Sequence, residues 1–137
     1  MQDCIFCKIV RGDIPSAKIL ETDTVLAFLD INPVSKGHTL VVPKKHYAAF
    51  SDIPPEVLIR LAEALQKVGI AVRSQLNSDG YNILLNNGLA AGQLIDHAHF
   101  HLIPRNQGDG VMDWPAVHPY ARGEMQAIRA RLANAVL

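Results

Sequence analysis

The stretch HAHFHLIP, residues 97–104, places histidine at the alternate positions 97, 99 and 101. Successive side chains of a β-strand point to opposite faces, so on a strand the three imidazoles share one face and the apolar residues between them share the other. With a rise of about 3.3 Å per residue, neighbouring histidines lie roughly 7 Å apart, which lets two of them contact one phosphate-sized group. The pattern predicts a strand over residues 97–104 with one apolar and one functional face.

Three imidazoles on one face suit two kinds of chemistry. They can bind a catalytic metal ion through neutral nitrogens, with a position left open for water. Alternatively, one imidazole attacks phosphorus as a nucleophile, and a protonated neighbour stabilises charge on the phosphate oxygens or passes a proton to the leaving group. A solvated surface position is the ordinary explanation for a single histidine, but strict alternation of three favours a functional site.

The rest of the chain predicts an antiparallel sheet with helices. Short apolar runs bounded by turn residues predict strands at 18–21, 25–30, 38–43 and 81–86. Five apolar residues recur at intervals of three and four and predict one long helix over about 54–76: Val57, Leu61, Leu65, Val68 and Val72. A short helix is expected over residues 4–11 and a C-terminal helix from about residue 123. We therefore expect an α+β fold with about five strands, one long helix and two shorter ones.

Length and charge narrow the class of protein. The 137 residues fit one domain, 1–137, that can bury a core without disulfides. Lys plus Arg equals Asp plus Glu at 13 each, so no excess positive charge favours a DNA or RNA polymer. No apolar run approaches the ~20 residues that a bilayer span needs, and no signal-peptide pattern opens the chain. We expect a cytoplasmic protein with no membrane partner.

The only two cysteines form the stretch CIFC, residues 4–7. A structural disulfide is not expected in the cytoplasm, which leaves a redox pair, two inert buried thiols or half of a metal site. A thioredoxin-like motif follows a strand, whereas only three residues precede Cys4, and this disfavours the redox pair. Together with His46 and one histidine of residues 97–101, Cys4 and Cys7 supply two thiolates and two imidazoles, the donor set of a four-coordinate zinc site.

Several blocks of the sequence resemble the histidine triad superfamily of nucleotidyl hydrolases and transferases. HAHFHLI matches the His-x-His-x-His signature of that family. Four other stretches look like family blocks in family order: IFCKIVRGDIPSAKI (5–19), VLAFLDINPVSKGHTLVVPKKH (25–46), GYNILLNN (80–87) and AGQ (91–93). The resemblance covers about residues 4–106 and is greatest to short, prokaryotic-type members close to the Hint branch, with residues 107–137 as a C-terminal extension.

This resemblance implies an enzyme that forms a covalent nucleotidyl-histidine intermediate on His99. By the same resemblance, His101 would contact the phosphate and assist transfer, and His38 would support the hydrogen bonding of the triad. The nucleotide ligands that it implies are Asp30 for the ribose hydroxyls, Asn86 and Gln93 for the α-phosphate region, and Ile31 and Phe28 for the purine. The expected substrates are AMP-like purine phosphoesters, phosphoramidates or phosphoanhydrides. Out of this context, Asp30 before Asn-Pro also fits a turn former.

The resemblance also implies a metal site and an assembly. In related prokaryotic members and in the galactose-phosphate uridylyl transferase branch, structural zinc is held by a set that includes the first histidine of the motif. By position the ligands here would be Cys4, Cys7, His46 and His97. A homodimer is implied as well, with the long helix and the strand before the triad loop at its two-fold interface.

Leu94 is a departure from the family pattern. Many members of the Hint branch carry Ser or Thr at this position, directly after the Gln of AGQ. A leucine side chain neither donates nor accepts a hydrogen bond, so help for the leaving group must come from His101 or water. Leu94 keeps open the alternative of a catalytically weak nucleotide-binding regulator. The three histidines keep open a second alternative, a zinc-dependent hydrolase with all three as ligands. Trp114 and His118 lie outside the matched blocks, and we expect packing roles for them.

Overall fold

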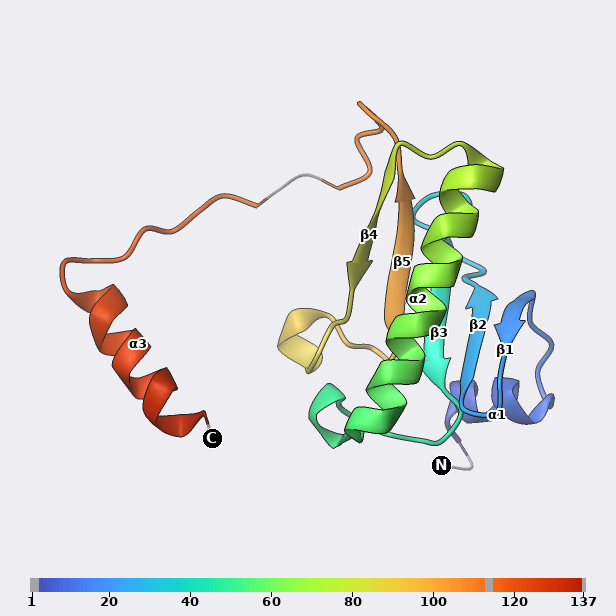
Figure 1. Cartoon of the computed structure of the whole chain (residues 1–137), viewed down its shortest axis with the longest axis horizontal. Helices are drawn as coiled ribbons and strands as arrows, with labels where there is room; N and C mark the ends of the chain where they lie inside the picture. The colour runs from blue at the N-terminus through green and yellow to red at the C-terminus, as the bar shows by residue number, and fades with distance from the viewer. Residues whose placement is uncertain (1–2, 113–114, 137) are drawn as a thin grey trace.

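A five-stranded antiparallel sheet in the order β1-β2-β3-β5-β4 forms the centre of the protein (Figure 1). The strands are β1 (Lys18–Glu21), β2 (Val25–Leu29), β3 (Thr39–Pro43), β4 (Gly80–Leu84) and β5 (Phe100–Arg105). The helices are α1 (Ile5–Arg11), α2 (Pro55–Leu76) and α3 (Glu124–Ala135), with short 3-10 turns η1 (Phe50–Asp52) and η2 (Leu89–Ala91). The computed structural model describes residues 3–112 and 115–136, and it confirms the expected α+β fold.

The sheet is covered on both faces, because each central strand sends alternate side chains to two separate clusters. On one face α2 packs over Val25, Ala27 and Val41. On the other face α1 brings Phe6 against a second set. That set consists of Leu26, Phe28, Leu40 and Val42. Burial on both faces explains why β2 and β3 read as continuous apolar runs.

The predicted apolar stripe of α2 packs as expected. Leu61, Leu65, Val68 and Val72 are buried, whereas Val57 near the helix start is only partly buried. The helix begins with a proline in its first turn, where a missing N–H costs no hydrogen bond, and ends at Asn77 in the left-handed conformation.

The predicted strand over residues 97–104 is wrong at its start, because β5 begins only at Phe100. In the register of β3 and β5, Val41 lies opposite Phe100, so two residues further along Pro43 would lie opposite Ala98. Proline has no N–H to donate, and the ladder stops there. The alternation of faces nevertheless continues, since Ala98 belongs to the cluster under α2 with Leu102. His97 and His99 therefore lie in the segment that leads into the strand, on the α1 side.

Other strand boundaries also differ from the prediction, and the differences matter for the site. β2 ends at Leu29, β3 begins at Thr39 and β4 ends at Leu84. Asp30, His38 and Asn86 consequently lie in connections rather than in strands. Gly37, with φ of +95°, lets the connection before β3 approach α2, since a Cβ there would clash with Leu76.

The C-terminal arm, residues 115–135, differs from the rest of the chain. No residue of α3 is buried, and Figure 1 shows this helix at the end of an extended segment, apart from the sheet. His118 is exposed, so its predicted packing role is wrong within this chain. Trp114 lies outside the described residues. In the ranges that the structure describes, no helix is long and apolar enough to cross a membrane.

Candidate functional site

A cleft of about 430 Å³ opens on the α1 side of the sheet. Six of the residues predicted to bind nucleotide line it together: Phe28, Asp30, Ile31, Asn86, His99 and His101. Its other walls are largely apolar side chains from α1, β3 and the loops: Ile5, Phe6, Ile9, Ile14, Leu40 and Ile95. The cleft thus combines an apolar chamber with two imidazoles and one carboxylate, a composition typical of small-molecule sites.

His99 presents one defined nitrogen to this cleft. Its Nδ1 lies 2.7 Å from the backbone carbonyl oxygen of His97, and because a carbonyl only accepts, Nδ1–H is the donor. Burial lowers the pKa of His99 below its usual value, which favours the neutral ring. A neutral ring protonated at Nδ1 keeps its lone pair on Nε2. The ring of Phe6 packs edge-on against it at 4.9 Å between centroids, which restricts its rotation.

His101 is oriented by His38 through a chain of hydrogen bonds. The Val34 N–H donates to His38 Nδ1 at 3.1 Å, so neutral His38 carries its proton on Nε2 and donates to His101 Nδ1 at 2.9 Å. His101 in turn carries its proton on Nε2. Burial, with the nearby charges of His99 and His38, lowers the pKa of His101 to about 4. The two imidazoles of the cleft therefore differ: His99 offers a lone pair and His101 offers an N–H.

Asp30 forms the turn that its sequence position allowed, and it also lies at the cleft. Its Oδ1 accepts a hydrogen bond from the Asn32 N–H at 2.9 Å, which is the expected turn. Its Oδ2 lies 3.8 Å from His38 Nε2, and the residue lines the cleft. The negative charge of Asp30 raises the pKa of His38, in opposition to the larger effect of burial.

Asn86 and Gln93 turn out to have different surroundings. Asn86 lines the cleft, beside Gly92, whose φ of +97° brings the loop close to it. Gln93 is buried, and its side-chain amide is committed to the backbone. Its Oε1 accepts from the Gly88 N–H at 2.9 Å. Its Nε2 donates to the carbonyls of Ala48 and Ile95 at 2.9 and 3.0 Å. The geometry gives Gln93 the work of shaping the loop over 88–95 rather than that of a phosphate ligand.

Leu94 lies at the rim of the cleft with 86% of its surface exposed. Ile31, on the opposite connection, is 90% exposed and also lines the cleft. Two large apolar side chains thus stand open to solvent at the mouth of the site. Exposure of this kind is typical of a surface that binds an apolar group of a ligand.

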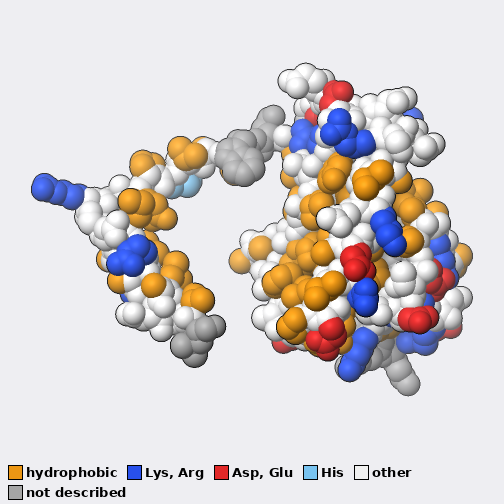
Figure 2. All heavy atoms as spheres, in the orientation of Figure 1, with side chains coloured by type: hydrophobic (Ala, Val, Ile, Leu, Met, Phe, Trp, Pro, Cys, Tyr) orange, Lys and Arg blue, Asp and Glu red, His pale blue; other side chains and the backbone are white. Residues whose placement is uncertain are grey.

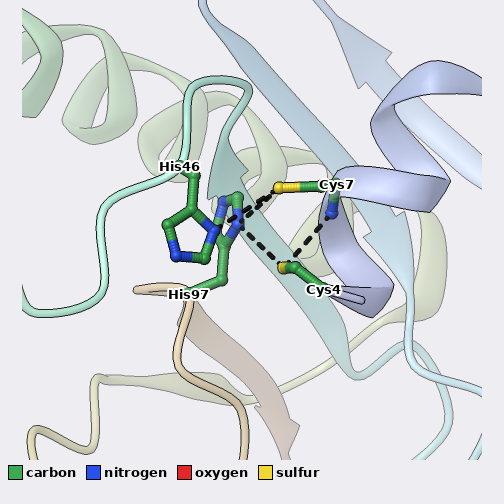
Figure 3. Close-up of side chains that lie close together, drawn as sticks. All are labelled: Cys4, Cys7, His46 and His97. Carbon is green, nitrogen blue, oxygen red and sulfur yellow. Dashed lines mark hydrogen bonds between the residues drawn. The ribbon is translucent and has the colours of Figure 1, made fainter. Parts of the chain in front are cut away.

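The second cluster lies beside the cleft and joins Cys4, Cys7, His46 and His97. The ligand atoms of the four residues all lie within 4.8 Å of one another, and Figure 3 shows their side chains converging from the start of α1, the connection after β3 and the segment before β5. His97 Nδ1 lies 3.4 Å from Cys4 Sγ and 3.7 Å from Cys7 Sγ, and His46 Nδ1 lies 3.4 Å from Cys7 Sγ. This set can hold a metal ion.

His97 is fixed for that purpose by the backbone. Its Nε2 lies 2.8 Å from the Pro43 carbonyl and must donate to it, so the lone pair of the neutral ring lies on Nδ1, the nitrogen beside the two sulfurs. Burial lowers the pKa of His97 and raises that of Cys7. Cys4 caps α1, since its Sγ accepts from the Cys7 N–H at 3.4 Å.

The three histidines of the motif do not converge on one point. Among the described residues, His97 groups with the two cysteines and His46, and His101 groups with Asp30 and His38. His99 belongs to neither group. The geometry therefore does not favour the alternative in which one metal ion is held by all three imidazoles.

Two backbone groups of the site could not be predicted from the sequence, because they act through main-chain atoms rather than side chains. The Val34 N–H and the Pro43 carbonyl decide which nitrogen of His38 and His97 is free, and no side-chain pattern marks them. Phe6, by contrast, packs against the rings of both His97 and His99. Its position between the two cysteines was a usable signal once the CIFC stretch was placed beside His97.

Comparisons with known proteins agree with this geometry. A family model described as "HIT domain" matches residues 11–108. The adenosine 5'-monophosphoramidase of Schizosaccharomyces pombe is 42% identical over 97% of this chain and 98% of its own length. The adenylylsulfatase of Arabidopsis thaliana is 45% identical over 78% of this chain, which spans 54% of that protein.

Solved structures give the same result. The crystal structure of a HIT family protein from Bacillus subtilis matches with a TM-score of 0.91 and 40% identity, over 98% of both chains. A Zn-bound histidine triad family protein from Mycobacterium smegmatis matches with a TM-score of 0.78 and 39% identity, over 98% of this chain and 96% of that one. On the strength of its matched residues, its fold and its two histidine clusters, this chain belongs to the HIT domain family.

Proposed function

We propose that this protein is a nucleotide hydrolase that transfers an AMP-like purine nucleotidyl group to His99 and then to water. The observation that carries the proposal is the hydrogen bond from His99 Nδ1 to the His97 carbonyl, because it leaves the Nε2 lone pair at the cleft. The names of the relatives from S. pombe and A. thaliana support hydrolysis of an adenylyl compound.

The first step breaks the bond between phosphorus and the leaving group. His99 Nε2 donates its lone pair to phosphorus, and the electron pair of the broken P–N or P–O bond passes to the leaving atom. That atom takes a proton from water, while the His101 Nε2–H donates a hydrogen bond that stabilises the negative charge on a phosphate oxygen or on the leaving atom. The products are nucleotidyl-His99 and the free amine, alcohol or acid.

The second step restores the enzyme. A water oxygen attacks phosphorus, its proton passes to solvent water, and the P–N bond electrons return to His99 Nε2. His101 is suited to this role because its pKa, lowered to about 4, keeps the ring neutral at pH 7, with its single proton on Nε2. His38 holds the ring of His101 in place throughout.

The cleft accounts for nucleotide binding in this proposal. The purine would occupy the apolar chamber around Phe28 and Ile31, and the Oδ2 of Asp30 would accept from the ribose hydroxyls. Asn86 would meet the phosphate. Gln93 would act only through the loop that it holds.

Structural zinc is the metal that the second cluster suits best. Tetrahedral Zn–S and Zn–N bonds of about 2.3 and 2.0 Å imply S···N separations of about 3.5 Å, close to the 3.4, 3.7 and 3.4 Å between the sulfurs and ring nitrogens. Zinc would tie α1 to the segment before β5 and so fix the His97 carbonyl that orients His99.

A homodimer is part of the same proposal. β4 is an edge strand of the sheet, and its Ile83 is exposed, as are Ile59 and Ile70 of α2. Figure 2 shows hydrophobic side chains spread over this face and along the C-terminal arm. An unpaired apolar edge strand is a ready surface for a second copy.

The experiment is mass spectrometry of protein quenched in alkali, which preserves the acid-labile P–N bond of a nucleotidyl-histidine, during turnover of an adenosine phosphoramidate. We expect a protein species heavier by one adenylyl group, mapped by peptide digestion to the segment that contains His99, and absent from His99→Ala. Turnover at the wild-type rate in His99→Ala would overturn the proposal.

A second candidate, a nucleotide-binding regulator with weak catalysis, is favoured by Leu94 at the rim of the cleft. It predicts tight binding of AMP with no turnover of phosphoramidates or dinucleoside polyphosphates. Calorimetry with AMP beside steady-state assays distinguishes the two functions.

A further inference from the structure

A second hollow, of about 410 Å³, adjoins the nucleotide cleft. It shares the walls Ile5, Leu94 and Ile95 with the cleft, and its other lining residues are Asp3, Cys4, His46 and Asp96. Neither the reaction proposed above nor the nucleotide uses it. The hollow does, however, contain two of the four residues of the metal cluster.

The metal cluster is asymmetric in its exposure. Cys7 and His97 are buried, with 8% and 0% of their surfaces exposed. Cys4 and His46 are half-buried, and both line the hollow. An ion that arrives from solvent through the hollow therefore meets Cys4 and His46 first, and reaches Cys7 and His97 only behind them.

The charges around the hollow favour a cation. Asp3 and Asp96 are exposed, and among the described residues that line the hollow there is no lysine or arginine. Two carboxylates at the mouth of a concave surface produce a negative potential that concentrates cations locally and increases their association rate. Carboxylate oxygens also bind hydrated divalent cations weakly enough to release them to thiolate ligands.

We propose that this hollow is the access route of the metal ion, in which Asp3 and Asp96 capture a hydrated divalent cation and deliver it to Cys4 and His46. Coordination then closes inward when Cys7 and His97 replace the remaining waters. The proposal rests on the metal site proposed above. It makes the bound metal exchangeable, at a rate that this acidic pair sets.

The test measures zinc uptake rather than catalysis. Full-length protein is stripped of metal under reducing conditions, and stopped-flow mixing with Zn²⁺ buffered by a chromophoric chelator gives the association rate constant. We expect the double variant Asp3→Asn/Asp96→Asn to take up zinc roughly 5- to 20-fold more slowly than wild type at low ionic strength. The difference should shrink at about 0.5 M salt, where the charges are screened.

A matched control removes the same charge elsewhere. Asp23 and Glu56 are exposed and line no part of the hollow, so Asp23→Asn/Glu56→Gln should take up zinc at nearly the wild-type rate. Equal slowing in both double variants would show an effect of net charge alone and would overturn the proposal.

Zinc binding and zinc uptake rate together separate two outcomes: a wrong metal site and a wrong access route. If wild type binds no zinc, the site itself is wrong and the access route falls with it. If wild type binds zinc and Cys7→Ser does not, but Asp3→Asn/Asp96→Asn is as fast as wild type, the site stands and the access route is overturned.

Discussion

His97 and His99 are two residues apart, yet they use opposite nitrogens. His97 donates through Nε2–H to the Pro43 carbonyl and presents Nδ1 to the sulfurs. His99 donates through Nδ1–H to the His97 carbonyl and presents Nε2 to the cleft. The same side chain thus serves two kinds of chemistry, and the deciding element is the backbone carbonyl that each ring finds.

The two regions are also linked. The carbonyl that orients His99 belongs to His97, and the ring of Phe6 packs against both imidazoles at 5.7 and 4.9 Å. A substitution among the metal ligands should therefore lower the rate of the chemical step only slightly. A substitution of His99 should leave the zinc content unchanged. The following predictions test this asymmetry, in order of decreasing effect.

The largest effect is expected for His99→Ala. Loss of the nucleophile should lower kcat on an adenosine phosphoramidate by about 10⁴-fold or more. Zinc content, measured by elemental analysis, should equal that of wild type, because the metal cluster does not include His99. A variant that lost its zinc would show that the two regions are one unit.

Cys7→Ser should have the reverse profile. Without bound metal, the free energy of unfolding should fall by about 4 kcal/mol when free zinc exceeds the wild-type Kd a thousandfold. The rate of the chemical step should change by less than about tenfold, since Cys7 lies outside the cleft. Denaturant unfolding with single-turnover kinetics measures both quantities, and full retention of zinc would contradict the assignment of this ligand.

His38→Ala should lower kcat by about 10- to 100-fold and change KM little. The reason is that His38 acts through the orientation of His101, to which its Nε2–H donates. The measurement is a pH profile of kcat, in which the limb that belongs to His101 should shift. A change in KM alone would assign His38 to substrate binding instead.

Acid should destabilise the metal-free protein in a defined window. Burial holds the pKa values of His38, His97, His99 and His101 below 6.5 in the folded state, so the unfolded chain binds protons first as the pH falls. The stability is fully present above pH 6.5 and is lost progressively toward the folded-state pKa of His101, about 4.

Urea midpoints between pH 7.5 and 4.5 measure this loss. His101→Asn removes one titrating ring and should reduce the slope of stability against pH. An unchanged slope in that variant would exclude His101 as a contributor.

The smallest effect is expected for Leu94→Ser. A hydroxyl at the rim can hydrogen-bond the phosphate or a small leaving group, and one neutral hydrogen bond raises kcat/KM by about 2- to 10-fold. Leu89→Ser is the control, because Leu89 is 80% exposed on the same loop but does not line the cleft. A rise in Leu89→Ser of the same size would point to loop flexibility rather than to a new hydrogen bond.

Much of the fold could be predicted from the sequence. The stripe on α2, the five-strand α+β architecture and the two faces of residues 98–102 follow from residue periodicity, which depends only on local geometry. The start of β5 was missed because strand length depends on the partner, and only the register with β3 puts Pro43 opposite Ala98. The boundaries around Asp30 and Asn86 were missed for the same reason.

The candidate site likewise has a part that could be predicted from the sequence and a part that depends on the fold. Residue types and spacing alone singled out two cysteines, the alternating histidines and a possible donor set with His46. Gln93 could not be separated from a phosphate ligand, because its backbone partners Gly88, Ala48 and Ile95 become neighbours only in the folded loop. The asymmetry of the metal cluster and the acidic hollow beside it likewise depend on burial.

The sequence by itself determined which chemistry is available: thiolates, imidazoles on one face and an apolar sheet to carry them. Only the tertiary structure decided how that chemistry is divided, with His97 beside the sulfurs and His99 at the cleft. The physical reason is that an imidazole has two nitrogens with exchangeable roles. Which of them is free depends on the nearest backbone acceptor, and folding alone brings the Pro43 carbonyl to His97 across the sheet.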